Sequence, residues 1–505
     1  MAPRPEPVAV VDIGSNSGRV MVYLQEGAGQ LRILAGSRAS LRLARGLDAS
    51  GLVPEAALER AFEALRDFRS IARGSGARGI LAAGTSALRD AANGPPFVAR
   101  VRRELGIEIR VLSGDEEARY GFVGAVGGLP VDHGVFFDLG GGSLQLSGFR
   151  QRRLQSALSL PLGALRVSDR FLRSDPPTAR ELRRLREHVR LALEAAGVGR
   201  LAEGGEVVGT GGTVRNLARV DERASGYPIP RLHGYVLSRR RLHDIAGRLT
   251  ALRLKKRARV PGMNADRRDS VAGGAVVLDV LLEILGADEL LVSGQGVREG
   301  LALSLGDGPG LEPADRVRQR AVEALAGRFA GWSKDRALRR VATAGALLRG
   351  VEPDALAEQA EALAHAACLL DIGRTVDFFD RHEHVADLVL ATDLAGFSHR
   401  LVALLSAVVR RAGDEDAPAR SLAPLVRQAD EPLVARTAVL LALADEITER
   451  CPPASEPAVT CRVRGDTVVV RVAALASWGP RRIDERFQTA YGRRLRVVPG
   501  FVVPD

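Results

Sequence analysis

The sequence predicts a mixed α/β protein made of two duplicated lobes, followed by an all-helical domain and a small C-terminal α/β domain. In two segments an apolar strand ends in an aspartate and leads into a glycine-bearing turn and a second strand; these aspartates, Asp12 and Asp138, lie 126 residues apart. From about Asp315 to Glu449, alanine and leucine recur at three- and four-residue spacing, which is typical of helices. After Pro453 an alternating apolar pattern returns, which predicts strands.

The first lobe is predicted over residues 1–127. Strands at Val8–Ile13 and Arg19–Leu24 flank a short polar turn, and an amphipathic helix follows over Pro54–Ala72. Farther along, shorter apolar runs alternate with helical stretches, at Gly79–Ala83 and Ile107–Leu112. This alternation is the pattern of a partly parallel sheet covered by helices.

The second lobe is predicted over residues 128–310, where it ends near Gly310. It opens with the strand and turn of Val135–Ser143 and continues through similar strand-to-turn signals at Val207–Thr213 and Leu290–Gly300. The layout repeats that of the first lobe, so we expect an internal duplication.

The helical domain is predicted over residues 311–452 and the small α/β domain over 453–505. The latter has strand patterns at Val468–Val472 and Arg494–Val498, with a charged helical stretch over Arg481–Tyr491 between them. The chain of 505 residues exceeds the size at which single hydrophobic cores stop growing, which agrees with several domains.

The charge of the chain favours a polyanionic partner. The formal net charge is +11, and nearly all of the positive charge is arginine, since Lys255, Lys256 and Lys334 are the only lysines. Arginine suits bidentate phosphate contacts, although a GC-rich genome explains the same bias. The basic stretches Arg180–Arg190 and Leu254–Arg259 could guide an anionic chain or form solvated helix faces. Nucleic acid is the weaker candidate, because only 4% of residues are aromatic and no basic stripe carries interleaved aromatics.

The sequence predicts a cytoplasmic location. The N-terminus lacks the pattern of a signal peptide, and no run of about 18 apolar residues indicates a membrane span. The three cysteines, Cys368, Cys451 and Cys461, have neither a paired framework nor metal-ligand spacing, so we expect reduced packing residues.

Four glycine-rich turns follow predicted strands, around Gly14, Gly140–Gly142, Gly209–Gly212 and Gly294–Gly296. Such turns expose backbone N–H groups that can bind phosphate, and any one of them is also explained as a tight connection. Several of them in duplicated lobes, two directly after an aspartate, favour a phosphate-binding cleft.

Two adjacent acids, Glu116 and Glu117, fall in the first turn of a predicted helix that begins after Ser113. Acids there stabilise the helix dipole, which is one interpretation. The other is hydrolysis of a phosphoanhydride, which needs a carboxylate to activate water and a cation to offset the charge of the phosphate oxygens. Glu117 and Asp138 could divide those tasks.

The sequence resembles a known family, the exopolyphosphatase / guanosine pentaphosphate phosphohydrolase (Ppx/GppA) family. The resemblance is strong over the first 305 residues and looser beyond them. The matching segments, in order along the chain, are Val11–Ser17, Ala83–Ala91, Ser113–Ala118, Phe137–Ser143, Gly209–Thr213, Pro261–Asp269 and Val297–Gly300. The resemblance implies duplicated actin-like (ribonuclease H-like, ASKHA) lobes and a homodimer.

The resemblance also implies the site residues. Glu117 would activate water, Asp138 would help to bind Mg²⁺ or position the water, and Arg89 would hold phosphate. Mg²⁺ would be held by Asp138 and Glu117, with a monovalent cation such as K⁺ as a further candidate. The residues implied to bind substrate are Asp12, Ser15, Asn16, Ser17, Arg89, Gly140, Gly141, Gly142, Ser143, Gln145, Gly211, Thr213 and Arg267.

Two departures from the family pattern stand out. Gln145 occupies a position where the family usually carries glutamate, and an amide is a poorer magnesium ligand that cannot take a proton. The helical domain looks like the HD-related domain of long family members, with candidate metal ligands at His365, Asp371, His382, His384 and Asp393. However, Leu370 precedes Asp371 where a histidine is expected, and the upstream histidine near Val341 is absent. We therefore predict a degenerate metal site, with a structural or polyphosphate-guiding role.

The expected function is that of an exopolyphosphatase, a phosphoanhydride hydrolase that acts on inorganic polyphosphate. Hydrolysis of guanosine pentaphosphate is an alternative, and so is a non-catalytic sensor that binds polyphosphate or an alarmone. Actin-like lobes also occur in sugar kinases and chaperone ATPases, and the family context of Glu117 argues against a kinase.

Overall fold

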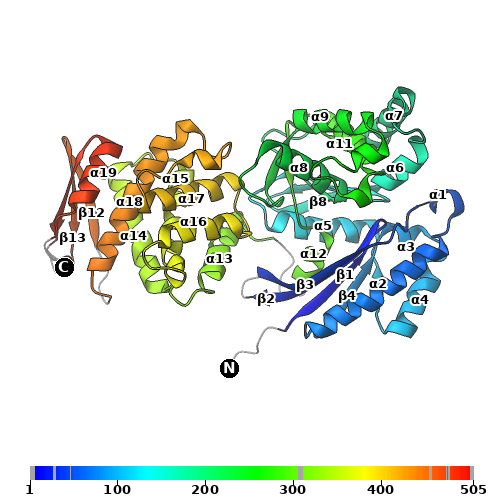
Figure 1. Cartoon of the computed structure of the whole chain (residues 1–505), viewed down its shortest axis with the longest axis horizontal. Coiled ribbons are helices and arrows are strands. Elements are labelled where there is room, and N and C mark those ends of the chain that lie inside the picture. Colours follow the sequence, from blue (N-terminus) through cyan, green and yellow to red (C-terminus); the bar gives the residue numbers. More distant parts are fainter. Residues whose placement is uncertain are drawn as a thin grey trace. The chain divides into compact units, whose positions relative to one another are not determined.

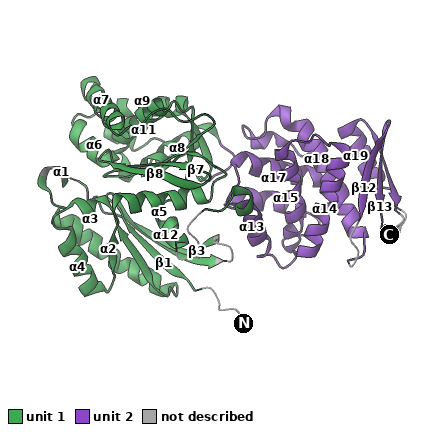
Figure 2. Cartoon of the chain, turned by 180° about the vertical axis from the view of Figure 1, so that it is seen from behind, with its two compact units in different colours: residues 1–226, 231–317 green, residues 227–230, 318–505 purple. Residues whose placement is uncertain are grey.

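The computed structural model describes residues 6–26, 30–45, 47–304, 311–453, 458–473, 475 and 478–500. The chain forms two compact units (Figures 1 and 2). Unit 1 holds residues 1–226 and 231–317, and unit 2 holds residues 227–230 and 318–505. The predicted end of the second lobe at Gly310 lies outside the described residues, and the four domain boundaries stay predictions.

The first lobe of unit 1 is built on a five-stranded sheet. Its order is β3-β2-β1-β4-β5, with β1 antiparallel to β2 and parallel to β4. The strands are β1 (Val8–Ile13), β2 (Ser17–Glu26), β3 (Gln30–Ser40), β4 (Ile80–Gly84) and β5 (Ile109–Val111). Its helices are α1 (Leu47–Ser50), α2 (Glu55–Gly74), α3 (Ser86–Asp90) and α4 (Gly94–Leu105). Helix α2 buries Leu58, Phe62, Leu65 and Phe68 in the core, as its apolar spacing predicted.

The second lobe repeats this sheet with one added strand. Its order is β10-β11-β9-β6-β7-β8, with β6 antiparallel to β7 and parallel to β9. The strands are β6 (Gly134–Leu139), β7 (Leu144–Arg150), β8 (Arg153–Leu160), β9 (Glu206–Gly211), β10 (Tyr235–Ser238) and β11 (Glu289–Val292). The helices are α6 (Ala164–Phe171), α7 (Ala179–Ala195), α8 (Gly212–Ser225), α9 (Arg239–Ala251), α10 (Leu254–Arg257) and α11 (Val271–Leu285).

The duplication extends to single hydrogen bonds. Gly14 N donates to Ser17 O at 3.1 Å, and Gly140 N donates to Ser143 O at 3.0 Å, 126 residues later. At the same offset, Asp12 pairs with Arg19 across β1 and β2, and Asp138 pairs with Gln145 across β6 and β7. The structure therefore confirms the predicted duplication, and it makes Arg19 the first-lobe counterpart of Gln145.

Two helices, α5 (Gly114–Gly127) and α12 (Val297–Leu303), lie between the sheets of the two lobes (Figures 1 and 2). They touch backbone to backbone. A Cβ atom at Gly124 would lie 1.9 Å from Gly296 O, and one at Gly300 would lie 1.9 Å from Tyr120 O. Only glycine fits at either position without separating the helices.

We expect Gly300→Ala to destabilise unit 1 by about 1–3 kcal/mol, because its methyl group cannot fit without moving α5 or α12. The free energy of unfolding from denaturant titration, followed by circular dichroism, measures this effect. Gly247→Ala is the matched control, since Gly247 lies inside α9 with open space around it. That substitution should stabilise the protein by about 0.5–1 kcal/mol. Equal effects of the two substitutions would contradict the close helix contact.

Unit 2 combines the helical segment with a small sheet. The helices are α13 (Ala314–Ala326), whose first residues belong to unit 1, α14 (Lys334–Val351), α15 (Ala357–Leu369), α16 (Arg381–Ala391), α17 (His399–Gly413), α18 (Glu431–Arg450) and α19 (Arg481–Tyr491). The strands are β12 (Val459–Arg464), β13 (Thr467–Val472) and β14 (Arg494–Pro499), in the order β12-β13-β14. One hydrophobic core runs from α14 and α17 to Val470 and Phe487, so the sheet and the helices share their interior.

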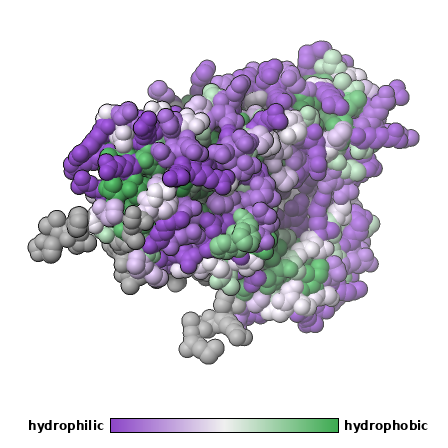
Figure 3. All heavy atoms as spheres, turned by 60° about the vertical axis from the view of Figure 1, so that its left-hand side comes forward, coloured by the Kyte–Doolittle hydropathy of each residue, from purple (hydrophilic) through white to green (hydrophobic). Residues whose placement is uncertain are grey.

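Hydrophilic residues cover most of the face shown in Figure 3, and hydrophobic residues gather there in smaller patches. The three cysteines are free. Among the described helices, none combines the length and the hydropathy of a membrane span.

Candidate active site

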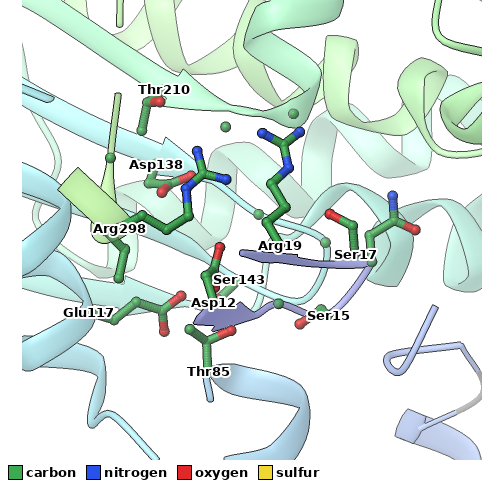
Figure 4. Close-up of a pocket in the computed structure, with 18 of the residues that line it drawn as sticks. Asp12, Ser15, Ser17, Arg19, Thr85, Glu117, Asp138, Ser143, Thr210 and Arg298 are labelled. Atoms are coloured by element: carbon green, nitrogen blue, oxygen red, sulfur yellow. The ribbon is translucent and has the colours of Figure 1, made fainter. Parts of the chain in front are cut away.

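A pocket of about 100 Å³ lies between the two lobes of unit 1, where the turns that follow β1 and β6 meet (Figure 4). Its lining consists mainly of short polar side chains, glycines, acids and arginines. The lining residues are Asp12, Gly14, Ser15, Asn16, Ser17, Arg19, Thr85, Ser86, Glu117, Asp138, Gly140, Gly141, Ser143, Thr210, Gly211, Gly212, Arg215, Arg267, Gly296, Val297, Arg298 and Glu299.

The two aspartates that end β1 and β6 face this pocket from opposite lobes. Burial raises the pKa of Asp138 to about 6, while Arg215 lowers it and Asp12 raises it further. Burial also raises the pKa of Asp12, against the opposing charges of Arg298 and Arg19. A nearby cation therefore stabilises the ionised form of both carboxyl groups, and each already has arginines close by.

The adjacent acids of α5 have different roles. Ser113 caps the helix: its Oγ accepts from Glu116 N at 3.1 Å, and the Glu116 carboxylate accepts from Ser113 N at 2.9 Å. This capping box, together with an ion pair to Arg110, holds Glu116 at the surface. Glu117 instead lines the pocket and is only 9% exposed. The capping interpretation therefore holds for Glu116, whereas the hydrolytic role of Glu117 stays a prediction.

Burial raises the pKa of Glu117 to about 8; Arg89 opposes the shift, and Asp138 adds to it. Arg89 Nη1 donates to Glu117 Oε2 at 3.2 Å and to Leu112 O at 2.7 Å. The arginine therefore orients the carboxyl group. A carboxyl with a pKa near 8 exchanges protons in the neutral range, which is what a general base requires.

Four arginines supply the positive charge of the pocket: Arg19, Arg215, Arg267 and Arg298. Figure 4 shows Arg19 and Arg298 pointing into the space near Asp12 and Asp138. Burial, together with the like charge of Arg215, lowers the pKa of Arg19 to about 9. Burial lowers the pKa of Arg215 and of Arg267 to about 10, with like charges contributing. These cations would be stabilised by an anion between them.

Two local arrangements hold these arginines in place. Arg267 lies directly against the backbone at the start of α8, where a Cβ atom at Gly212 would come within 1.8 Å of its Cζ. Arg298 is followed by the buried Glu299, whose carboxylate accepts from Tyr23 Oη at 2.6 Å and from Gly296 N at 2.7 Å. Burial disfavours the charged form of Arg298, but the charges of Glu299, Asp12 and Tyr23 outweigh this effect, so the pKa of Arg298 is raised.

The turns of the two lobes also touch. The hydroxyl groups of Ser15 and Ser86 are hydrogen-bonded at 2.8 Å, and both lie close to the Cα of Gly142 in the other lobe. The side-chain amide of Asn16 is buried at the pocket without a hydrogen-bond partner among the described residues. A buried amide in this state can bind a ligand oxygen at little desolvation cost.

The structure brings most of the predicted site residues together. Those that line the pocket are Glu117, Asp138, Asp12, Ser15, Asn16, Ser17, Gly140, Gly141, Ser143, Gly211 and Arg267. Four predicted residues lie outside the lining: Arg89, Gly142, Gln145 and Thr213. Arg89 bonds to Glu117, Gly142 packs on Ser15 and Ser86, and Thr213 packs against Gly274.

Sequence reasoning missed several lining residues, Arg19, Thr85, Ser86, Thr210, Arg215, Val297, Arg298 and Glu299, whereas Gly14, Gly212 and Gly296 fall in glycine turns that it singled out. Some carried a usable signal. Thr85 and Arg298 stand inside segments that carry the family resemblance, and the duplication pairs Arg19 with Gln145. Arg215 carried no signal, because it follows its glycine turn inside an ordinary helical pattern.

Gln145 is buried, and its Nε2 donates to Ser143 Oγ at 2.7 Å. Its side chain therefore acts on the pocket through Ser143. We expect Gln145→Glu to raise the rate of phosphate release at limiting magnesium by about two- to tenfold, because the added negative charge beside the pocket increases its affinity for a divalent cation. Gln155→Glu, which adds the same charge on the exposed side of β8, is the control. Equal rates of wild type and Gln145→Glu would show that this position does not limit the reaction.

The candidate metal ligands of unit 2 do not assemble. Arg340, one residue before Val341, is fully buried; its Nη2 lies 2.8 Å from Asp371 and its Nε 2.7 Å from Asp445. Burial and the charge of Arg318 lower the pKa of His365 to about 4, and its ring packs on Phe397. Among the described residues, no group of three or more histidines, cysteines or acids is arranged to hold a metal.

The finding that no three candidate ligands are grouped among the described residues applies to unit 1 as well, and it limits how magnesium could bind there. Mg²⁺ is commonly held by one or two carboxylates, with phosphate oxygens and water completing its shell. Asp138 and Glu117, two buried carboxyl groups with raised pKa values in a pocket that suits phosphate, fit that mode. They would not form a metal site from protein ligands alone.

The fold and the site together define the class of protein: two actin-like lobes that enclose an arginine-lined pocket. The sequence profile of the Ppx/GppA phosphatase family matches residues 22–307, and that of Ppx/GppA phosphatase, domain III, matches residues 317–467. The chain belongs to the Ppx/GppA phosphatase family.

Relatives and solved structures agree with this assignment. Exopolyphosphatase 1 of Mycobacterium bovis is 32% identical over 330 residues, which cover 63% of this chain and 95% of that protein. Exopolyphosphatase 2 of Mycobacterium tuberculosis is 32% identical over 314 residues, 59% of this chain and 98% of that protein. The crystal structure of the Aquifex aeolicus member of the Ppx/GppA family has a TM-score of 0.52 at 27% identity, over 59% of this chain and 97% of that one. The predicted fold class is confirmed.

Proposed function

We propose that the chain removes the terminal phosphate of inorganic polyphosphate by magnesium-dependent hydrolysis, with Glu117 activating the attacking water. The observation that carries this proposal is the position of Glu117. Its buried carboxyl group shares one small pocket with four arginines and the glycine turns of both lobes. The relatives named exopolyphosphatases, which are 32% identical, support polyphosphate as the substrate.

In this mechanism the protein first binds the terminal phosphate. Arg19, Arg215, Arg267 and Arg298 would neutralise its oxygens, and the backbone N–H groups of the turns after β1 and β6 would orient it. When bound by Asp138 and Glu117, Mg²⁺ would supply charge neutralisation of the phosphate oxygens. The small volume of the pocket would leave room for few water molecules beside the phosphate.

Hydrolysis then transfers one proton to Glu117. The ionised carboxylate accepts a proton from water as the water oxygen bonds to the terminal phosphorus. The bond from that phosphorus to the bridging oxygen breaks, and its electron pair stays on the shortened chain. Arg89 keeps the Glu117 carboxyl group oriented throughout this step.

A substrate panel tests the proposal. Purified protein with magnesium is given short polyphosphate, long polyphosphate and guanosine pentaphosphate, and orthophosphate release is measured. Release from polyphosphate, lost in Glu117→Ala while binding persists, supports the exopolyphosphatase. Faster release from guanosine pentaphosphate would favour the alarmone hydrolase, and tight binding with no release from any substrate would favour a non-catalytic sensor. A homodimer, also part of this proposal, is tested by light scattering of the same preparation.

The proposed base predicts the pH dependence of the reaction. Only the ionised Glu117 accepts a proton, and with a pKa of about 8 its ionised fraction grows as the pH rises. We expect kcat/KM for phosphate release to increase about tenfold between pH 7 and pH 9. Glu116→Gln should show the same profile, because Glu116 faces Ser113 and Arg110. A flat profile over this range would contradict the role of Glu117.

A further inference from the structure

Three charged residues form a row across the first-lobe sheet, on the neighbouring strands β1, β2 and β3. Asp12 lies directly opposite Arg19, and Arg19 lies directly opposite Arg38. Opposite residues of antiparallel strands point to the same face of the sheet, so the three side chains lie side by side. Asp12 and Arg19 line the pocket (Figure 4), whereas Arg38 is not among the lining residues. Because strands are spaced about 4.8 Å apart, Arg38 lies one strand farther from Asp12 than Arg19 does.

The row places two guanidinium groups next to each other, and a third comes from the second lobe. Like charges directly opposite each other destabilise a sheet. Burial, then the charge of Arg38 and that of Arg19, lower the pKa of Arg267 to about 10. Three cations therefore lie close together, which costs free energy unless an anion lies among them.

The protein itself holds Arg38 only weakly. Among the described residues its one ion pair is with Asp266, at 3.5 Å between Nη2 and Oδ2. Its Nε and Nη2 atoms are buried and form no hydrogen bond within the described part of the chain. These two N–H groups lie along one edge of the guanidinium, an arrangement that binds two oxygens of one phosphoryl group. The Asp266 side chain is 51% exposed, so a phosphoryl group can displace it at little cost.

Arg42, four residues after Arg38, is fully engaged by comparison. Its Nη1 donates to Asp269 Oδ2 at 2.8 Å, and its Nη2 donates to Asp266 O at 3.1 Å. These bonds hold the segment that contains Arg267 beside the end of β3. Arg42 therefore fixes the place of Arg267 near Arg38, and Arg38 stays available for a ligand.

The second lobe carries no cation at the corresponding positions of its own sheet. There Asp138 lies opposite Gln145, and Gln145 lies opposite Ser159. The first-lobe row thus consists of an acid and two arginines, and the second-lobe row of an acid, an amide and a hydroxyl group. An anionic chain that extends out of the pocket is therefore attracted toward β2 and β3 of the first lobe.

We propose that Arg38, together with Arg19 and Arg267, forms a second anion subsite that binds the phosphoryl group next to the terminal one. A polyphosphate chain then leaves the pocket across β2 and β3, and the protein prefers linked phosphates to a single phosphate. The identity of the ligand rests on the function proposed above, whereas the arrangement of the three arginines does not.

Two ligands of different length test the subsite, because tripolyphosphate reaches both positions and orthophosphate fills the pocket alone. Their affinities for the full-length protein are measured by isothermal titration calorimetry without magnesium, so that no substrate is consumed. We expect Arg38→Gln to weaken tripolyphosphate binding at least about tenfold and orthophosphate binding less than about threefold, since only the longer ligand loses charge-assisted hydrogen bonds.

A second variant should act in the opposite direction. Asp266→Asn removes the carboxylate that competes for Arg38, so tripolyphosphate binding should strengthen about two- to fivefold. A gain of affinity cannot come from misfolding, so this variant tests the subsite even if Arg38→Gln is unstable. Unchanged or weaker tripolyphosphate binding by Asp266→Asn would count against the subsite.

The matched control is Arg32→Gln, which removes the same charge from the same strand. Arg32 lies opposite Leu24, and alternation along β2 places it on the other face of the sheet from Arg19. Both affinities should stay within about twofold of wild type, because solvent and salt screen a charge at that distance. Equal losses for the two ligands in Arg38→Gln, no loss for either, or an equal loss in the control would overturn the subsite. A loss for tripolyphosphate alone, in a protein that releases no phosphate, would keep the subsite and reject the proposed hydrolysis.

Discussion

Replacing Glu117 by glutamine should reduce kcat for phosphate release by about 10²- to 10⁴-fold, because the amide cannot accept a proton from water. Binding of polyphosphate should persist, since all four pocket arginines remain. Phosphate release and equilibrium binding on the same preparation measure both effects. Glu116→Gln is the control and should retain activity, because Glu116 caps α5 outside the pocket. A Glu117→Gln protein with near-wild-type turnover would remove the proposed base from the mechanism.

The same substitution should change stability in a pH-dependent way. The unfolded chain loses the Glu117 proton near pH 4.5, whereas the folded chain keeps it to about pH 8. In that window the folded state binds more protons, so the stability of wild type falls as the pH rises. We expect Glu117→Gln to be close to wild type in its free energy of unfolding at pH 5 and more stable by up to roughly 5 kcal/mol at pH 9. A stability difference that does not change with pH would show that burial does not hold this carboxyl group neutral.

Arg340→Met should destabilise unit 2 by about 1–3 kcal/mol, because it removes the cation between the buried Asp371 and Asp445 and leaves each with one arginine, Arg374 and Arg381 respectively. Both tryptophans lie in unit 2, so tryptophan fluorescence during denaturant titration follows the unfolding of this unit. Arg349→Met, an exposed position on the same helix, is the control and should change stability by less than about 0.5 kcal/mol.

A second variant separates charge from packing at this site. Adding Asp371→Asn to Arg340→Met should recover part of the lost stability, because it removes one of the two buried charges. Additive losses instead would show that Arg340 acts by filling space. In either case the measurement uses the same fluorescence transition.

Much of the fold could be predicted from the sequence. The helix expected over Arg481–Tyr491 has those bounds in the structure, and the strands expected at Val468–Val472 and Arg494–Val498 each extend by one residue. Local periodicity decides such elements, because one face of each is buried in the core of its unit. The duplication was also visible, since it repeats the same aspartate and glycine turn.

The site was predicted less completely, for physical reasons. The motifs place acids and glycines at strand ends, where backbone geometry alone brings them to the cleft. Which arginine reaches the pocket depends on side-chain partners that the sequence does not reveal. Arg89 is held by Leu112 O and Glu117, whereas Arg298 stands over the pocket because Glu299 is anchored by Tyr23 on a distant strand. The structural role of Arg340 likewise depends on Asp371 and Asp445, which packing brings beside it.

The glycine contact between α5 and α12 has a mechanical consequence. Glu117 lies in the first turn of α5 and Arg298 in the first turn of α12, and the backbones touch at Gly124 and Gly300. The two helices therefore form one rigid pair, which fixes the distance between the Glu117 carboxyl group and the Arg298 guanidinium. If the flanking sheets pivot about this helix pair, the mouth of the cleft widens or narrows while Glu117 and Arg298 keep their spacing, so anions of different size would meet the same two charged groups.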